Sequence, residues 1–203
     1  GVCFDFHTDS DFIGFKYSIN GKARDWMCFD IYIDDVFVDS IYQKPVVNLE
    51  GEITYSIPGE KGKLKHVTIY LPHLVEIVIS DIELSDNAQI EEAQLYEKSI
   101  LCLGDSITQG MDALHPSSAY PVQLSRFFGM NLINHGVGGY IFNKISLDEA
   151  LQFNPDIITV AYGTNDWNKF GTIEEFTLYV KEFMEKLTEI YSEAKIYVIT
   201  PIW

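Results

Sequence analysis

The sequence has few cysteines, few basic residues and no long apolar run. Its three cysteines, Cys3, Cys28 and Cys102, are an odd number and lie at unrelated spacings in apolar stretches. This pattern predicts buried free thiols rather than a disulfide framework or a metal site, and it slightly favours a reducing, cytoplasmic compartment. Because the chain begins with Gly1 rather than Met, a secreted protein whose signal peptide has been removed is the alternative.

The shortage of positive charge excludes several classes of partner. The 203 residues include 14 Lys and Arg against 30 Asp and Glu, which gives a formal net charge of −16. Binding to nucleic acid or to an anionic membrane surface needs clustered cations, so we expect no nucleic-acid partner. No apolar stretch approaches the roughly 20 residues of a membrane-spanning helix, so we expect no membrane span. A hydrophobic content of 47% predicts a packed core rather than disorder.

The first part of the chain has the pattern of β-structure. Apolar and polar residues alternate from Ile13 to Ile19, and Asn20-Gly21 then predicts a hairpin turn. The same alternation runs from Met27 to Ile33. About seven short strands separated by turns are typical of a β-sandwich or jelly roll. We therefore predict an all-β domain over residues 1–90, followed by a polar, acidic linker over residues 91–98.

The pattern changes in residues 99–203, where short apolar strands alternate with amphipathic helices. We expect strands at 99–103, 131–134, 156–162 and 195–200, and helices at 118–128, 146–153 and 172–191. The last two helices each begin with the spacing of a capping box, at Ser146 and at Thr172. Buried strands separated by helices predict a parallel sheet that helices cover on both faces.

Three loops rich in glycine and small polar residues follow three of these strands. They are Gly104–Gly110, His135–Tyr140 and Gly163–Asp166. In such a sheet the ligand crevice lies at the carboxyl ends of the strands. Ser106 offers a nucleophilic hydroxyl there, and its backbone N–H, an N–H of the glycine cluster and the Asn165 amide could form an oxyanion hole. For the Ser106 loop taken alone, an ordinary strand-to-loop turn is an equally good interpretation.

These loops carry a family resemblance. Gly104-Asp105-Ser106, a glycine after Asn134, and Gly163-Thr164-Asn165-Asp166 resemble, in order and spacing, the first three sequence blocks of the GDSL/SGNH hydrolases. Aligned on Asn134, the oxyanion glycine of that family falls on Gly139, with Gly138 as the near alternative. The resemblance extends over roughly the second half of the chain, from residue 98 to the end.

The resemblance implies a fold and a set of roles. The fold is a flavodoxin-like α/β/α sandwich of the SGNH type, which is incomplete in this sequence, and the preceding β region resembles the jelly-roll domain of two-domain carbohydrate esterases. By the same resemblance Ser106 is the nucleophile, and Ser106, Gly139 and Asn165 form the oxyanion hole. Asp105 then shapes the turn rather than acting as a catalytic acid. No metal and no other cofactor is implied.

The sequence departs from the family at the general base. The family's catalytic His lies in a late Asp-x-x-His block, which finds no match after the last expected strand, so we expect this sequence to be truncated before it. The stretch Asp112-Ala113-Leu114-His115 has the spacing, but it lies only nine residues after Ser106 and is interpreted as a coincidence. Whether Asp112 and His115 substitute for the base stays open. His135 lies near the crevice without an evident partner.

The sequence therefore predicts a serine esterase that removes a short acyl group, acetyl above all, from a carbohydrate. Its partner would be a small-molecule or oligosaccharide ester. A lysophospholipase or thioesterase of the same fold is one alternative and would require a wide apolar cleft. A carbohydrate-binding module with an inactive α/β portion is another. Trp167, beside the third loop, either forms the wall of a substrate pocket or packs the loop.

Overall fold

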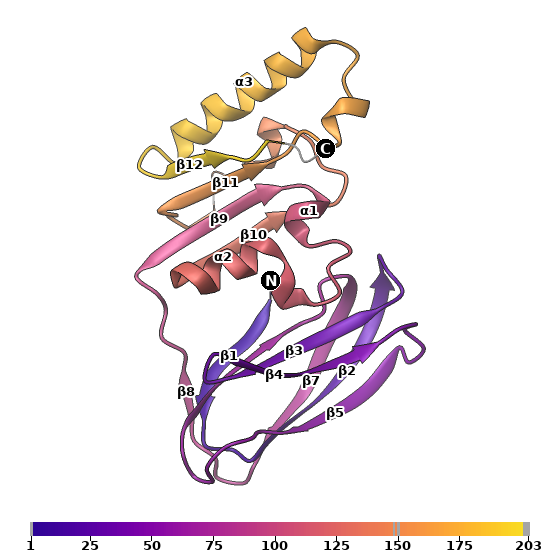
Figure 1. Cartoon of the computed structure of the whole chain (residues 1–203), viewed down its shortest axis with the longest axis vertical. Helices are drawn as coiled ribbons and strands as arrows, with labels where there is room; N and C mark the ends of the chain where they lie inside the picture. The colour runs from indigo at the N-terminus through magenta and orange to yellow at the C-terminus, as the bar shows by residue number, and fades with distance from the viewer. Residues whose placement is uncertain (1, 148, 150, 201–203) are drawn as a thin grey trace. The chain divides into compact units, whose positions relative to one another are not determined.

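The computed structural model describes residues 2–147, 149 and 151–200, and the chain divides into two compact units (Figure 1). The β unit comprises Gly1–Leu95 together with the short segment Asp112–Ser118. The α/β unit comprises Tyr96–Met111 and Ala119–Trp203. The domain limits inferred from composition, near residues 90 and 99, remain predictions.

The β unit consists of two antiparallel sheets. Its strands are β1 (Cys3–Thr8), β2 (Phe12–Lys22), β3 (Met27–Ile33), β4 (Val36–Gln43), β5 (Glu50–Ser56), β6 (Lys65–Tyr70), β7 (Val75–Leu84) and β8 (Ile90–Glu92). The strand orders are β4-β3-β6-β1-β8 in one sheet and β5-β2-β7 in the other. Strand β8 overlaps the start of the expected linker and pairs with β1.

The hairpin turn predicted at Asn20-Gly21 is wrong. Asn20 and Gly21 do not form a turn between two strands, because β2 continues through them to Lys22. The pairing of β2 with β7 shifts register between Ile19 and Gly21, so the glycine is accommodated in a β-bulge. A tight turn lies instead between β3 and β4, where Asp34 and Asp35 have φ values of 49° and 64°.

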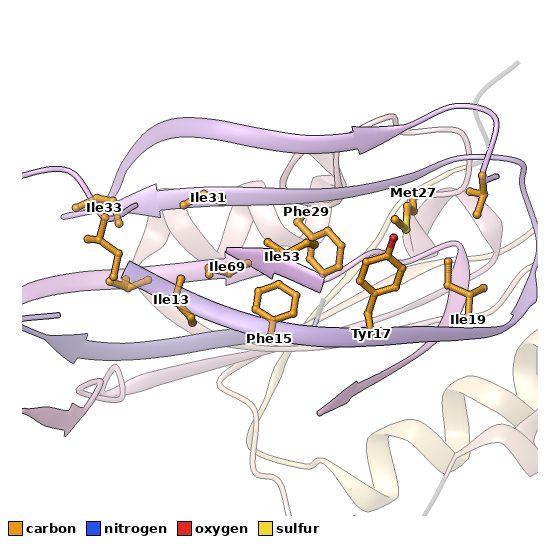
Figure 2. Close-up of a cluster of buried hydrophobic side chains, with 13 residues drawn as sticks. Ile13, Phe15, Tyr17, Ile19, Met27, Phe29, Ile31, Ile33, Ile53 and Ile69 are labelled. Atoms are coloured by element: carbon orange, nitrogen blue, oxygen red, sulfur yellow. The ribbon is translucent and has the colours of Figure 1, made fainter. Parts of the chain in front are cut away.

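The core of the β unit lies between its two sheets. Phe15 and Tyr17 of β2 face Phe29 of β3, with ring centroids 5.4 Å and 6.3 Å from that of Phe29 (Figure 2). Ile53 of β5 and Ile69 of β6 are buried in the same cluster. The alternation seen in the sequence thus places one face of each sheet in a common core. This is a two-sheet sandwich, while its assignment as a jelly roll remains a prediction.

The α/β unit is a four-stranded parallel sheet with helices on both faces. Its elements are β9 (Lys98–Gly104), α1 (Ser106–Gln109), α2 (Tyr120–Phe128), β10 (Met130–Gly136), η2 (Lys144–Ser146), β11 (Ile157–Ala161), η3 (Asp166–Asn168), α3 (Ile173–Ile190) and β12 (Lys195–Val198). The strand order is β10-β9-β11-β12, and every pair is parallel. Leu101 and Ile158 pack with Phe183 of α3 on one face, whereas Ile100 and Cys102 pack with Leu124 of α2 on the other.

The predicted helices have different outcomes. The long helix is confirmed as α3, and Thr172 caps it by accepting a hydrogen bond from the Glu175 N–H at 3.1 Å. The helix expected over 146–153 is wrong for the residues described, since 151–153 are not helical and Asp148 and Ala150 lie outside the described residues. Pro155 follows closely, and the residue before a proline prefers an extended backbone. No helix in the described part of the chain is long and apolar enough to cross a bilayer.

Candidate active site

The strand order brings the three glycine-rich loops to one edge of the sheet. Gly104, the last residue of β9, is in register with Gly136 of β10 and with Ala161 of β11. All three strands are parallel, so the loops that follow them leave the sheet side by side. The chain order reverses around β9, and open α/β sheets bind their ligands at such a switch point. Ser106 follows the central strand and Asn165 follows its neighbour β11.

The first loop is a tight strand-to-helix turn that presents Ser106. The buried Asp105 is the N-cap of α1, and its Oδ1 accepts a hydrogen bond from the Ile107 N–H at 2.9 Å. Ser106 is the first residue of α1 and is half-buried. Among the residues that the structure describes, none forms a hydrogen bond with Ser106 Oγ. A Cβ at Gly104 would lie 1.9 Å from Thr108 Oγ1, so only glycine fits where the turn folds back on β9.

The second loop is fastened to α1 by side-chain amides. Asn134 Oδ1 accepts from the Gly136 N–H at 2.9 Å, and Asn134 Nδ2 donates to the Thr108 carbonyl at 2.9 Å. The Gly138 N–H donates to Gln109 Oε1, also at 2.9 Å. Asn134 and Gln109 therefore hold the glycine cluster against the helix that begins with Ser106.

The two candidate oxyanion glycines differ in their surroundings. An ideal Cβ at Gly138 would lie 3.9 Å from Ser106 Cβ, which places Gly138 beside the serine, but its N–H is used by Gln109. Gly139 has a φ of +77° and no atom within 4 Å of its ideal Cβ position. A left-handed backbone with open space before it suits a glycine whose N–H is to meet a ligand.

The third loop connects back to the first through Asn165. Asn165 Nδ2 donates to the Tyr140 carbonyl at 3.0 Å and to Asp105 Oδ2 at 3.3 Å. The neighbouring Asp166 is buried, and its two oxygens accept from the Phe142 N–H at 3.0 Å and the Gly163 N–H at 2.9 Å. Burial raises the pKa of Asp166, while these backbone hydrogen bonds oppose the shift. Asp166 therefore shapes the loop that carries Asn165.

A cavity of about 560 Å³ opens beside the third loop, between that loop and the start of α3. Trp167, Phe170, Ile173 and Phe176 line it, together with Asp166. Trp167 is 75% exposed and lines the cavity, so its indole forms an outer wall of the cavity rather than packing inside the loop. Of the two interpretations left open for Trp167, the structure agrees with the pocket wall.

The histidine and aspartate of the Asp-x-x-His match have separate partners, both in the β unit. Asp112 Oδ1 accepts from Arg24 Nε at 2.7 Å. His115 Nδ1 lies 2.7 Å from Oδ1 of the buried Asp30. His135 is an exposed residue of β10. None of these three residues belongs to the loops that present Ser106 and Asn165.

Sequence reasoning missed two contributors to the site. Gln109 fixes the glycine cluster, and Phe170 and Phe176 are two of the apolar residues that line the cavity. A signal existed for Gln109, since a residue three positions after Ser106 in a one-turn helix lies on the same side of it. Phe170 closely follows the third loop and Phe176 lies in α3, but no local pattern indicates that either contacts the cavity.

Comparison with known proteins decides the family. The model of the GDSL-like lipase/acylhydrolase family matches residues 102–203, half of the chain. The chain belongs to this family. It is therefore assigned to the ester hydrolases, as the three loops had led us to expect. No curated protein sequence matches the chain.

Solved structures of similar fold span both units. A family two carbohydrate esterase from Clostridium thermocellum, in complex with cellohexaose, matches with a TM-score of 0.78 at 12% identity over 100% of this chain and 72% of that one. A putative GDSL-like lipase from Bacteroides ovatus gives 0.78 at 24% identity, over 98% and 60%. An acetyl xylan esterase from Butyrivibrio proteoclasticus gives 0.71 at 14% identity, over 97% and 72%. At these identities the likeness establishes the fold, an SGNH-like arrangement of sheets and helices.

Proposed function

We propose that this chain is the acyl-transfer part of a serine esterase that removes short acyl groups, acetyl above all, from a carbohydrate. Ser106 attacks the ester carbonyl and forms an acyl-enzyme, which water then hydrolyses. One observation carries the proposal. Asp105, which caps the helix that begins with Ser106, also accepts a hydrogen bond from Asn165, so both residues lie at the switch point of the parallel sheet. The family match over the same residues supports it.

The oxyanion hole is proposed to consist of the Ser106 and Gly139 N–H groups and the Asn165 amide. Asn165 Nδ2 has two hydrogens, and the longer of its contacts, 3.3 Å to Asp105, is the weaker. Substrate would take this hydrogen while the 3.0 Å bond to the Tyr140 carbonyl keeps the amide oriented. Such preorganised donors act on the charge that develops in the transition state, and one donor is worth about 10²–10³-fold in kcat.

The general base is proposed to come from outside the described residues. Ser106 Oγ has no hydrogen-bond partner among them, and a base must lie within hydrogen-bond reach of the proton it removes. In the family a His of a late Asp-x-x-His block has this role, as the resemblance implies.

Two observations support a carbohydrate as the alcohol part of the substrate. Most of the β unit, Gly1–Leu95, precedes the Ser106 loop, and the whole chain shares its fold with two carbohydrate esterases. One of these esterases is in complex with cellohexaose, and the other is an acetyl xylan esterase. The acetyl preference is inferred from these similarities.

One observation favours the lysophospholipase or thioesterase alternative. The sequence showed no conspicuously apolar loop at the site, yet the cavity next to the third loop is lined by Trp167, Phe170, Ile173 and Phe176, together with Gly163 and Asp166 of that loop. At about 560 Å³ it falls within the range of small-molecule pockets, roughly 300–1,000 Å³. An acyl chain longer than acetyl would fill it.

The proposal is tested on the intact natural protein. A fluorophosphonate should label the wild type and the Ser56→Ala variant, whose serine is exposed on β5, but not Ser106→Ala. Acetate release from acetylated xylan, set against fatty-acid release from a lysolipid, separates the two esterase proposals. Absence of labelling, together with sugar binding by the β unit, would instead favour a binding module with an inactive α/β part.

A further inference from the structure

The face of β3 that points away from the core of the β unit carries a second buried cluster. Phe29 and Ile31 enter the core between the sheets, so the alternate residues Cys28 and Asp30 point to the opposite face. Cys28 is 2% exposed and Asp30 is 0% exposed. Residues of the segment Asp112–Ser118, which belongs to the same unit, cover them.

Three ligand-type atoms converge in this cluster. His115 Nδ1 lies 2.7 Å from Asp30 Oδ1, and Cys28 Sγ lies 3.4 Å from that oxygen and 3.6 Å from Nδ1. The other carboxylate oxygen, Asp30 Oδ2, accepts from the Ser117 N–H at 2.9 Å and from Ser117 Oγ at 2.7 Å. Sulfur, imidazole nitrogen and one carboxylate oxygen therefore face a common point, while Ser117 anchors the second oxygen.

These separations are close to those of a tetrahedral zinc site. With metal–ligand bonds of about 2.0–2.3 Å, neighbouring ligand atoms lie roughly 3.4–3.6 Å apart. Both distances from Cys28 Sγ already fall in that range. The His115–Asp30 distance of 2.7 Å is that of a hydrogen bond, which would open by about 0.7 Å when a cation replaces the shared proton.

We propose that Cys28, Asp30 and His115 bind a divalent cation of the zinc class, with the fourth position open to water. A thiolate and a carboxylate together neutralise the two positive charges of such an ion, which matters at a buried site. His115 is the ligand nearest to solvent, since 41% of its side chain is exposed against 0% of that of Asp30, and it marks the entry path. Nothing in the proposed esterase mechanism requires this ion.

Metal binding at this site releases one proton, that of the Cys28 thiol. Burial, with the negative charge of Asp30, raises the pKa of the Cys28 thiol to about 12, so without metal the sulfur is protonated. Coordination forms the metal–sulfur bond and releases this proton to solvent. Ser117 stays bound to Asp30 Oδ2 throughout and orients the carboxylate, as outer-shell partners do in metal sites.

Cobalt titration of the metal-free protein tests the site, because Co²⁺ bound by a thiolate gives a charge-transfer absorption that Co²⁺ on nitrogen and oxygen ligands does not. We expect one equivalent of Co²⁺ to produce this band, and Zn²⁺ to abolish it. Cys28→Ser should lose the band. The matched controls Cys3→Ser and Cys102→Ser, which remove the other free cysteines, should keep it.

Competition with a chromophoric chelator then gives the Zn²⁺ affinity. Ser117→Ala keeps all three ligands and should weaken Zn²⁺ binding by about 10–100-fold, the usual effect of losing an outer-shell partner. The proposal is overturned if the wild type gives no thiolate band, if the band follows Cys3 or Cys102, or if Ser117→Ala binds Zn²⁺ as the wild type does. The Ser117 variant decides the matter even where Cys28→Ser fails to fold. In the overturned case the cluster only anchors the segment Asp112–Ser118 to β3.

Discussion

Gly136→Ala should displace the helix that presents Ser106. Gly136 ends β10 against α1, and an ideal Cβ there would lie 2.1 Å from the Gln109 nitrogen and 2.5 Å from the Thr108 carbonyl carbon. Ordinary contacts begin at 3.4 Å, so the shortfall is 1.3 Å. Both obstructing atoms belong to the backbone and cannot rotate away. Helix α1 must therefore move by more than 1 Å, or β10 must separate from β9.

The expected cost follows from this overlap. Overpacking a tight site costs about 1–3 kcal/mol, and a clash with backbone belongs at the upper end of that range. For a chain of this size, about 3 kcal/mol corresponds to a fall in Tm of roughly 6–12 °C. A displacement of 1 Å at a catalytic group can cost on the order of 10²-fold in rate, so we expect esterase kcat to fall by about that factor in the intact protein.

Thermal unfolding and amide hydrogen exchange measure the effect. The Gln109 N–H donates to the Asp105 carbonyl at 3.0 Å and the Met111 N–H to the Ser106 carbonyl at 2.9 Å, so both amides should exchange faster in Gly136→Ala. Gly171→Ala is the matched control, because its Cβ would meet only Glu175 Oε2, at 3.9 Å. It should be neutral or stabilise by about 0.4–1 kcal/mol. Wild-type Tm and exchange rates in Gly136→Ala would refute the steric argument.

Three further predictions concern the two units separately. Asn165→Ala in the intact protein should lower esterase kcat by about 10²–10³-fold with little change in KM, measured by steady-state kinetics. Asp105→Asn should keep the cap of α1, and the free energy of unfolding should therefore stay within about 0.5 kcal/mol of the wild type. The variant should still reduce kcat, because an NH₂ group would replace the carboxylate oxygen that accepts from Asn165 Nδ2. In the metal-free protein, burial raises the pKa of Cys28 from 9.0 to about 12, so the folded state keeps a proton that the unfolded state loses. The free energy of unfolding should fall between pH 9 and pH 12, and less steeply in Cys28→Ser.

The sequence predicted the strands better than the burial of their outer faces. Periodicity indicated the parallel strands because buried strands of an α/β fold are almost wholly apolar, as β9 and β11 are. For β3 it indicated which residues enter the core, but not that Cys28 and Asp30 on the other face are buried too. That burial depends on the segment Asp112–Ser118, more than 80 residues away, and alternation along one strand carries no information about it.

Local capping patterns predicted helices only where the following residues could form one. The pattern at Thr172 precedes an 18-residue amphipathic stretch without proline, and α3 forms there. The same spacing at Ser146 is followed within ten residues by Pro155, and the described residues between them form no α-helix. Instead Leu147 is buried in the core beside β11. A capping box therefore indicates a helix start only in combination with the sequence that comes after it.

The Asp-x-x-His match shows why spacing alone cannot assign a catalytic base. In the β unit Asp112 binds Arg24 at a solvent-exposed ion pair, whereas His115 Nδ1 binds the buried Asp30. Each residue thus has its own partner, and we expect the 203-residue chain to hydrolyse p-nitrophenyl acetate slowly and at the same rate in His115→Gln, whose amide can still donate to Asp30. A general base contributes about 10²–10⁴-fold. A rate that falls by such a factor in His115→Gln, with the far-UV circular dichroism unchanged, would identify His115 as the base and contradict its assignment to the Asp30 cluster alone.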